Sequence, residues 1–236
     1  MKNSEGEGAV CQTLSDLSDL LDKFDGRDKT IRSLHFALVL IANRFRDRRK
    51  SDRLMAFAKQ FSRTRLICRL FSQPSLLLSV LRIPRAFRLS LDRVDCALAS
   101  SVSVLYLFCG WNELISLLAE SGLVGRAKAN ILKFHGNALH LWVLALAFCI
   151  FRCLRQIALR LMPKANALAR HQHNDRQWLR SQFISLIGFS ADFVAAVNLL
   201  PRGSFWAGKL SPSQSAALHL TASVIGMFKQ IQLIKK

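Results

Sequence analysis

Acidic residues are scarce in this sequence, which has 15 Asp and Glu against 34 Lys and Arg in 236 residues, a formal net charge of +19. Charged residues of both signs nevertheless make up only 21% of the chain, while hydrophobic residues make up 51%. This composition excludes an intrinsically disordered chain, because disordered chains are poor in large apolar residues. A chain that is both basic and apolar instead favours the surface of an anionic membrane, with part of the chain inserted.

Motifs that carry catalysis or bind cofactors are also absent. The sequence has no GxGxxG or GxxxxGK[ST] phosphate loop, no GxSxG elbow and no HExxH zinc motif. Its six cysteines form no CxxC pair, which excludes a zinc ribbon and a thioredoxin motif. His171 and His173 would point to different helix faces with only Asp175 nearby, whereas a metal site needs three or four converging ligands. We therefore predict no enzymatic activity, no cofactor and no metal site.

Targeting signals are missing as well. The first residues, MKNSEGEGAVCQ, lack the apolar core of a secretory signal and the Arg-rich character of a mitochondrial presequence. The last residues, LIKK, are not the SKL-type peroxisomal address. We expect a chain that faces the reducing cytosol, with its cysteines as buried free thiols.

Apolar residues recur with a helical period, and no alternating pattern is long enough to predict a strand. Residues 14–24 predict a short amphipathic helix that Gly26 ends. Asp28 is predicted to cap the next helix, which runs to about Arg46. The apolar stripe of that helix consists of Ile31, Leu34, Leu38, Ile41 and Phe45. The sequence therefore predicts an all-α fold.

Prolines separate the helices that follow. A basic helix is predicted over residues 51–73, where Pro74 ends it. Residues 76–93 are apolar with interspersed arginines, and Pro84 interrupts them. A long apolar helix is predicted over residues 96–118.

Two uncharged apolar stretches are long enough to cross a membrane. Residues 134–151 would extend about 27 Å as a helix, close to the bilayer core of about 30 Å. Residues 210–228 contain Ser, Thr, Gln and His and form the weaker candidate. We predict about two transmembrane helices, at 134–153 and 210–230. Small residues of the second suit helix contacts in lipid, namely Ala216, Ala217, Ala222, Ser223 and Gly226.

These spans divide the chain into a cytosolic or interfacial amphipathic region, 1–133, and a membrane region, 134–236. The apolar stretches 96–112 and 183–200 adjoin or contain acidic residues, so we expect them to pack in protein or lie in the interface. Between the two spans, residues 152–209 hold nine bases and two acids. That loop would oppose the positive-inside tendency, which loops of this length obey poorly, or part of it would form a membrane-associated helix on the cytosolic side.

Positive charge concentrates in residues 44–93, which hold fourteen Arg or Lys against three acids. Aromatic residues of the basic helix would enter the acyl boundary, and its cations would meet lipid phosphates at about 1 kcal/mol each. The candidate lipid-binding residues are Phe57, Phe61, Phe71, Lys59, Arg63, Arg65 and Arg69. Arg65 falls near the apolar face and interrupts it. An ordinary core helix with arginines in water is the alternative interpretation.

Two segments stand out, namely FDGRDKTIRSL near the beginning of the chain, with Gly26, Arg27 and Asp28, and NLLPRGSFWAGKLSP towards its end. Both resemble the peroxin-11 family, whose members elongate peroxisomal membranes, and the first is similar to the start of those proteins. The segment NLLPRGSFWAGKLSP resembles a block that precedes the last membrane helix in the gamma-type (C-type) branch. Its matching residues are Leu200, Pro201, Arg202, Gly203, Trp206, Ala207 and Gly208.

The resemblance implies a multi-pass peroxisomal membrane protein with both termini in the cytosol. It implies homo-oligomers that promote elongation and fission of peroxisomes, together with contacts to a fission adaptor and a dynamin-like GTPase. The membrane-bending amphipathic helix of the family would map to about 54–71.

Two alternatives remain open from the sequence. A channel for small metabolites, a role assigned to some members of the family, would need a polar path, for which Asp192 and Asn198 are the candidates. A soluble helical nucleic-acid binder would also be basic, but the apolar stretch 134–151 argues against it, so we predict anionic lipids and no nucleic acid as partners.

Overall fold

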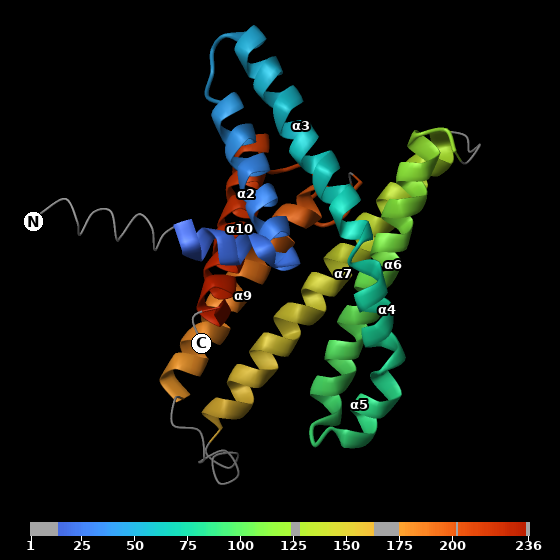
Figure 1. The fold of residues 1–236 in the computed structure, drawn as a ribbon, viewed down its shortest axis with the longest axis vertical. Coiled ribbons are helices and arrows are strands. Elements are labelled where there is room, and N and C mark those ends of the chain that lie inside the picture. Colours follow the sequence, from blue (N-terminus) through green and yellow to red (C-terminus); the bar gives the residue numbers. More distant parts are fainter. Residues whose placement is uncertain (1–13, 124–127, 163–174, 202, 235–236) are drawn as a thin grey trace, which may run out of the picture.

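The computed structural model describes residues 14–123, 128–162, 175–201 and 203–234, in which no strand occurs (Figure 1). Residues 14–22 form a short helix. The helices that follow are α2 (Phe24–Ala42), α3 (Arg48–Leu70), α4 (Gln73–Leu81), α5 (Ile83–Leu89), α6 (Arg93–Glu120), α7 (Lys128–Leu161), α9 (Asp175–Asn198) and α10 (Pro212–Ile234). The predicted all-α fold is confirmed.

Local signals explain several helix ends. The Asp47 carboxylate caps α3 by accepting a hydrogen bond from the Arg49 amide at 3.0 Å. Asp92 caps α6 in the same way, accepting from the amides of Val94 and Asp95. Pro74 lies in the first turn of α4 and Pro84 in that of α5, where the missing amide hydrogen costs no helical bond.

The predicted boundary around Gly26 is wrong. The first helix ends before Lys23, α2 begins at Phe24, and Gly26 lies inside α2. A Cβ at Gly26 would lie 1.8 Å from the Leu20 carbonyl oxygen, so glycine permits close packing of the two helices instead of ending one. Asp28 is also inside α2 and does not cap it; its carboxylate pairs with Arg65 instead.

The helices pack as pairs (Figure 1). α6 and α7 form one long antiparallel pair, and α9 packs on both α7 and α10. α2 lies on α10 and forms a hairpin with α3, while α4 and α5 lie along α6. Residues from the beginning and the end of the chain are therefore in direct contact.

Small side chains fill the contacts between the membrane helices. Ala145, Ala195 and Ala196 are fully buried, which brings neighbouring backbones close. In α10 the small residues Ala216, Ala222 and Ser223 are buried as the sequence predicts, whereas Ala217 is exposed. Several large apolar side chains of these helices are exposed, among them Phe108, Leu144, Phe151 and Ile187.

Three helices are long and apolar enough to cross a membrane, namely Arg93–Glu120, Ile131–Leu161 and Arg176–Asn198. The predicted span 134–153 falls within the second. The other two contain the stretches 96–112 and 183–200, for which we expected packed or interfacial helices. The predicted span 210–230 forms α10, which is not among the three. Its crossing of the membrane stays a prediction.

Ion pairs bracket the uncharged part of α6. At its beginning Asp92 pairs with Arg155 at 2.6 Å and Asp95 with Arg152 at 2.8 Å, both across to α7. Towards its other end Glu113 pairs with Arg69 of α3 at 2.9 Å. The 18 positions from Asp95 to Glu113 correspond to about 27 Å of helix, close to the bilayer core of about 30 Å.

Candidate functional site

The aromatic residues proposed to bind lipid lie on and just beyond α3. Phe57 is 55% exposed and Phe71 is 79% exposed. Phe61 is half-buried and packs edge-on against Phe57, with their ring centroids 5.1 Å apart. On the face towards α2, Ala58 is buried. α3 therefore contacts the protein along one face and presents two aromatic rings beside it.

The four cations proposed to bind lipid divide into two kinds. Lys59 and Arg63 are exposed. Arg65 and Arg69 instead turn into the protein, where Arg65 Nε lies 2.8 Å from Asp28 Oδ1 and Arg69 pairs with Glu113. Arg65 interrupts the apolar stripe because its partner is a carboxylate of α2. Two of the four predicted cations are therefore structural in this arrangement.

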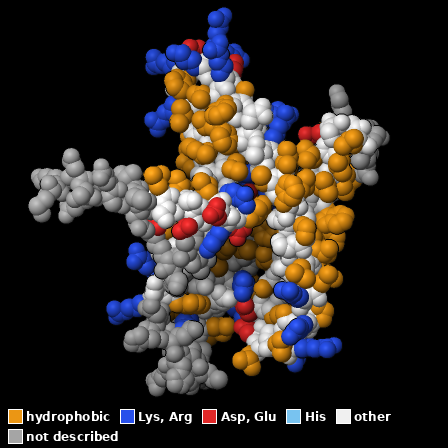
Figure 2. Space-filling view, viewed as in Figure 1, with side chains coloured by type: hydrophobic (Ala, Val, Ile, Leu, Met, Phe, Trp, Pro, Cys, Tyr) orange, Lys and Arg blue, Asp and Glu red, His pale blue; other side chains and the backbone are white. Residues whose placement is uncertain are grey.

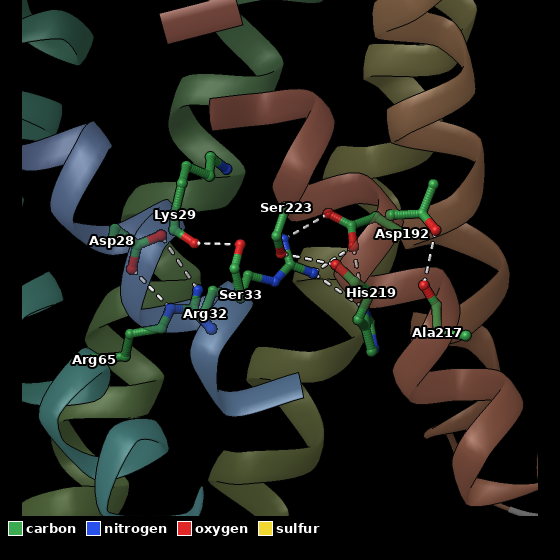
Figure 3. A network of polar contacts seen from close by, with 10 residues as sticks. Asp28, Lys29, Arg32, Ser33, Arg65, Asp192, Ala217, His219 and Ser223 are labelled. Carbon is green, nitrogen blue, oxygen red and sulfur yellow. Dashed lines mark hydrogen bonds and ion pairs between the residues drawn. The ribbon is translucent and has the colours of Figure 1, made fainter. Parts of the chain in front are cut away.

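The Asp28–Arg65 pair, seen in Figure 3, joins α2 to α3, and His35 makes a second contact between them. Burial alone would raise the pKa of Asp28, but the Arg65 guanidinium outweighs burial and holds that pKa below its usual value. His35 Nδ1 lies 2.8 Å from the Ala58 carbonyl oxygen and donates to it, because a carbonyl only accepts. Burial lowers the pKa of His35, so its ring is neutral at pH 7.

A buried cluster of three polar residues joins α2, α9 and α10 (Figure 3). Arg32, Asp192 and His219 are 4%, 7% and 1% exposed. Arg32 donates to both carboxylate oxygens of Asp192, with one distance of 2.7 Å. His219 Nδ1 lies 3.0 Å from both Asp192 Oδ1 and Arg32 Nη2. The bidentate pair satisfies two charges that would be costly to bury alone.

Aromatic rings enclose the cluster. His219 stacks on Phe36 of α2 at 4.5 Å and on Trp142 of α7 at 5.8 Å. The Arg32 guanidinium lies 5.7 Å and 5.6 Å from the same two ring centroids, within cation–π range. Four helices thus meet at one polar centre, which the sequence did not predict. From the sequence, Asp192 is only an acid within an apolar stretch and a candidate for a channel, and Arg32 has no predicted role.

Two charged residues of α2 point inward while two of its large apolar residues point outward. Asp28 and Arg32 contact other helices, whereas Leu34 and Ile41 are each about half exposed. In water the opposite orientation would be expected. The exposed apolar side chains of α2 are better suited to an apolar environment than to water.

The two residues considered for a channel are both engaged inside the protein. Asp192 is paired with Arg32 and His219. The Asn198 side chain accepts from the Leu210 amide at 2.8 Å and donates to the Leu210 carbonyl at 3.3 Å. Neither residue offers a free polar group to a conducting path, so they give the channel hypothesis no support.

The sequence matches the family described as Peroxisomal biogenesis factor 11 (PEX11) over residues 14–231. This chain belongs to the PEX11 family. It is 24% identical over 237 residues to human Peroxisomal membrane protein 11C. The alignment covers 92% of this chain and 94% of the human protein. No solved structure matches it. PEX11 comprises peroxisome biogenesis factors and is not an enzyme family, and membership associates this chain with the peroxisomal membrane.

Residues 26–28, which resemble the start of peroxin-11 proteins, lie near the beginning of α2. Gly26 is buried against the first helix, Arg27 is exposed, and Asp28 binds Arg65. These three consecutive residues therefore point to the first helix, to the exterior and to α3. Their roles are structural in the described contacts.

Residues 200–208, the second segment that resembles the family, lie in the turn between α9 and α10. Leu200 is buried, Pro201 is exposed, and Trp206 Nε1 donates to the Val194 carbonyl at 2.9 Å. The amide of Ala207 donates to the Ser204 carbonyl. Arg202 lies outside the described residues.

Two glycines of this turn occupy the left-handed region, Gly203 with φ 107° and Gly208 with φ 73°. The Gly208 amide donates to the Asn198 carbonyl at 3.0 Å, closing the turn against the end of α9. Together with the Asn198 side chain, the motif fixes how α10 leaves α9. That placement brings His219 to Asp192.

Proposed function

We propose that this PEX11 protein elongates peroxisomal membranes by inserting the apolar edge of α3 into the cytosolic leaflet, without catalysis. The observation that carries the proposal is the exposure of Phe57 and Phe71 next to the exposed cations Lys59 and Arg63. Figure 2 shows hydrophobic side chains along the α2–α3 hairpin and Lys and Arg at its tip. This combination is typical of a helix that lies in an anionic interface.

The proposed mechanism depends on the fixed position of α3. Arg65 and Arg69 attach the helix to α2 and α6, so its depth is set by the membrane-crossing helices. Burial of each aromatic ring in lipid contributes about 1.5–3 kcal/mol, and each cation near an anionic surface about 1 kcal/mol. A helix held at this depth expands one leaflet relative to the other. Homo-oligomers would concentrate that expansion and lengthen the organelle.

The insertion mechanism is tested with the full chain in vesicles that contain phosphatidylserine. The substitutions Phe57→Glu and Phe71→Glu together should abolish tubulation seen by electron microscopy, because two carboxylates would have to enter the acyl region. The matched control carries Gln60→Glu and Ser62→Glu, which add the same charge at exposed positions of α3 without removing an aromatic ring. Tubulation by the Phe double variant at the wild-type level would refute insertion by α3.

We further propose that both termini face the cytosol, where a fission adaptor and a dynamin-like GTPase would reach them. With a tag at each terminus, protease treatment of intact peroxisomes should remove both tags before any detergent is added. Protection of one tag alone would instead indicate an odd number of crossings.

A further inference from the structure

α4 and α5 present an apolar and cationic surface that the proposed role of α3 does not use. Leu81 is 68% exposed and Leu89 is 73% exposed, and Leu77, Leu78 and Leu91 are exposed as well. Residues 73–91 contain no acidic residue. Exposed apolar side chains at this density are unfavourable in water and mark a contact surface.

Three arginines lie among these leucines. Arg82, Arg85 and Arg88 are exposed, and no carboxylate in the described part of the chain pairs with them. This distinguishes them from Arg65 and Arg69, whose charges are satisfied inside the protein. The surface of α4 and α5 therefore has a net positive charge that the protein itself does not balance.

The position of the two helices relates this surface to the membrane. At the beginning of α4, Gln73 lies against Gly110 of α6, and Leu77 lines an apolar cavity of about 310 Å³ with Trp111. α4 and α5 then run back along α6 until the chain reverses at residues 90–92. α5 therefore ends beside the beginning of α6, where Asp92 and Asp95 pair with α7.

The cationic end of this surface thus lies at one boundary of the uncharged stretch of α6, and the leucines of α4 lie beside the stretch itself. Figure 2 shows hydrophobic side chains over α4 and α6, with Lys and Arg gathered towards α5. Long arginine side chains can extend to the interface while their stems remain in apolar surroundings. The arrangement fits a membrane, with acyl chains at α4 and headgroups at α5, at the boundary opposite to the one marked by Arg69 and Glu113.

We propose that α4 and α5 form a second lipid-binding element, which lies in the membrane beside α6 and binds the phosphate groups of anionic phospholipids through Arg82, Arg85 and Arg88. A second copy of the chain is the less suitable occupant. A symmetric contact through the same face would bring three arginines against three arginines. An anionic membrane instead complements both the charge and the leucines. α4 and α5 are separate from α3, so they would bind lipid in this way even if α3 did not bend membranes.

Photo-crosslinking of the full chain tests this assignment. A benzoylphenylalanine residue replaces Leu81 or, in a second variant, Leu89, and the protein is reconstituted in vesicles with equal amounts of phosphatidylserine and phosphatidylcholine. Mass spectrometry of the irradiated protein should show lipid adducts from both positions, with phosphatidylserine in excess. Adducts to a second copy of the chain, or none to lipid, would overturn the proposal.

Charge substitutions then test the headgroup contact. The triple change Arg82→Gln, Arg85→Gln and Arg88→Gln should lower the ratio of phosphatidylserine to phosphatidylcholine adducts at least fivefold, because each cation near an anionic surface contributes about fivefold in binding. The control triple Lys133→Gln, Arg176→Gln and Arg180→Gln removes the same charge from exposed positions outside α3, α4 and α5 and should leave the ratio unchanged. An unchanged ratio in the first triple, or an equal fall in both, would refute binding by these arginines.

Discussion

Replacement of Asp192 by alanine is expected to lower the free energy of unfolding by about 3–5 kcal/mol, because it leaves the Arg32 guanidinium buried without a counter-ion. Arg32 is 4% exposed and lies between two aromatic rings, so water reaches it poorly. Arg32→Ala should lower the free energy of unfolding by a similar amount, because it leaves the Asp192 carboxylate buried without its counter-ion. Thermal unfolding of the protein in detergent, followed by circular dichroism at 222 nm, measures both.

Replacement of both partners by apolar residues separates the ion pair from the surrounding packing. The variant that combines Arg32→Met with Asp192→Leu replaces the pair by apolar side chains and should recover most of the lost stability, as buried pairs replaced by apolar groups often do. Arg63→Ala, at an exposed position, should change the free energy of unfolding by less than about 0.5 kcal/mol. Two single variants as stable as wild type would mean that the cluster does not hold α2 against α9 and α10.

Arg65→Gln is expected to lower the free energy of unfolding by about 1.5–3 kcal/mol, because it removes a charge-assisted pair from a largely buried carboxylate. The pKa of Asp28 lies below its ordinary value of 3.8 in the folded protein. Its contribution is therefore fully present above pH 3.8 and is lost as the pH falls through the lower, folded pKa. Wild-type stability should decline in this acidic range more steeply than that of the variant, which has already lost the pair.

The exposed cations of α3, unlike Arg65, should affect lipid binding and not stability. The double variant Lys59→Gln and Arg63→Gln should keep wild-type stability but bind vesicles with a weaker dependence on phosphatidylserine and on salt. Arg65→Gln should keep that dependence. If Arg65→Gln weakened it while leaving stability unchanged, Arg65 would be a lipid ligand, as the sequence alone suggested, and its ion pair would not matter.

The sequence predicts the helices well and their orientations poorly. Pro84 and the capping residues Asp47 and Asp92 act within a few residues, so helix boundaries near them can be inferred locally. The prediction that Pro74 ends the helix 51–73 is wrong, because α3 ends at Leu70 and Pro74 lies in the first turn of α4. The apolar stripe of α2 was also recognised. Whether such a stripe faces protein or the exterior depends on the solvent, and a periodic pattern contains no information about which solvent surrounds it.

The polar centre was beyond local inference for a different reason. Arg32 and Asp192 are 160 residues apart, and His219 is 27 residues further on. Only the packing of α2 on α10, and of α9 on α10, brings them together. The only local signals were an arginine in α2 and an acid within an otherwise apolar helix. Gly26 shows the same limit, since a glycine can end a helix or allow close contact, and its surroundings decide which.

The contact between α2 and α10 also dictates an order of events during synthesis. A ribosome that has completed residue 200 has released α2 and α3 but has not yet made His219. Until the last helix emerges, Arg32 has no complete set of partners, and the nascent N-terminal half must be shielded by a chaperone or by lipid. Truncated chains that end before α10 should therefore resemble this unfinished state, so results obtained with them describe a folding intermediate and not the complete fold.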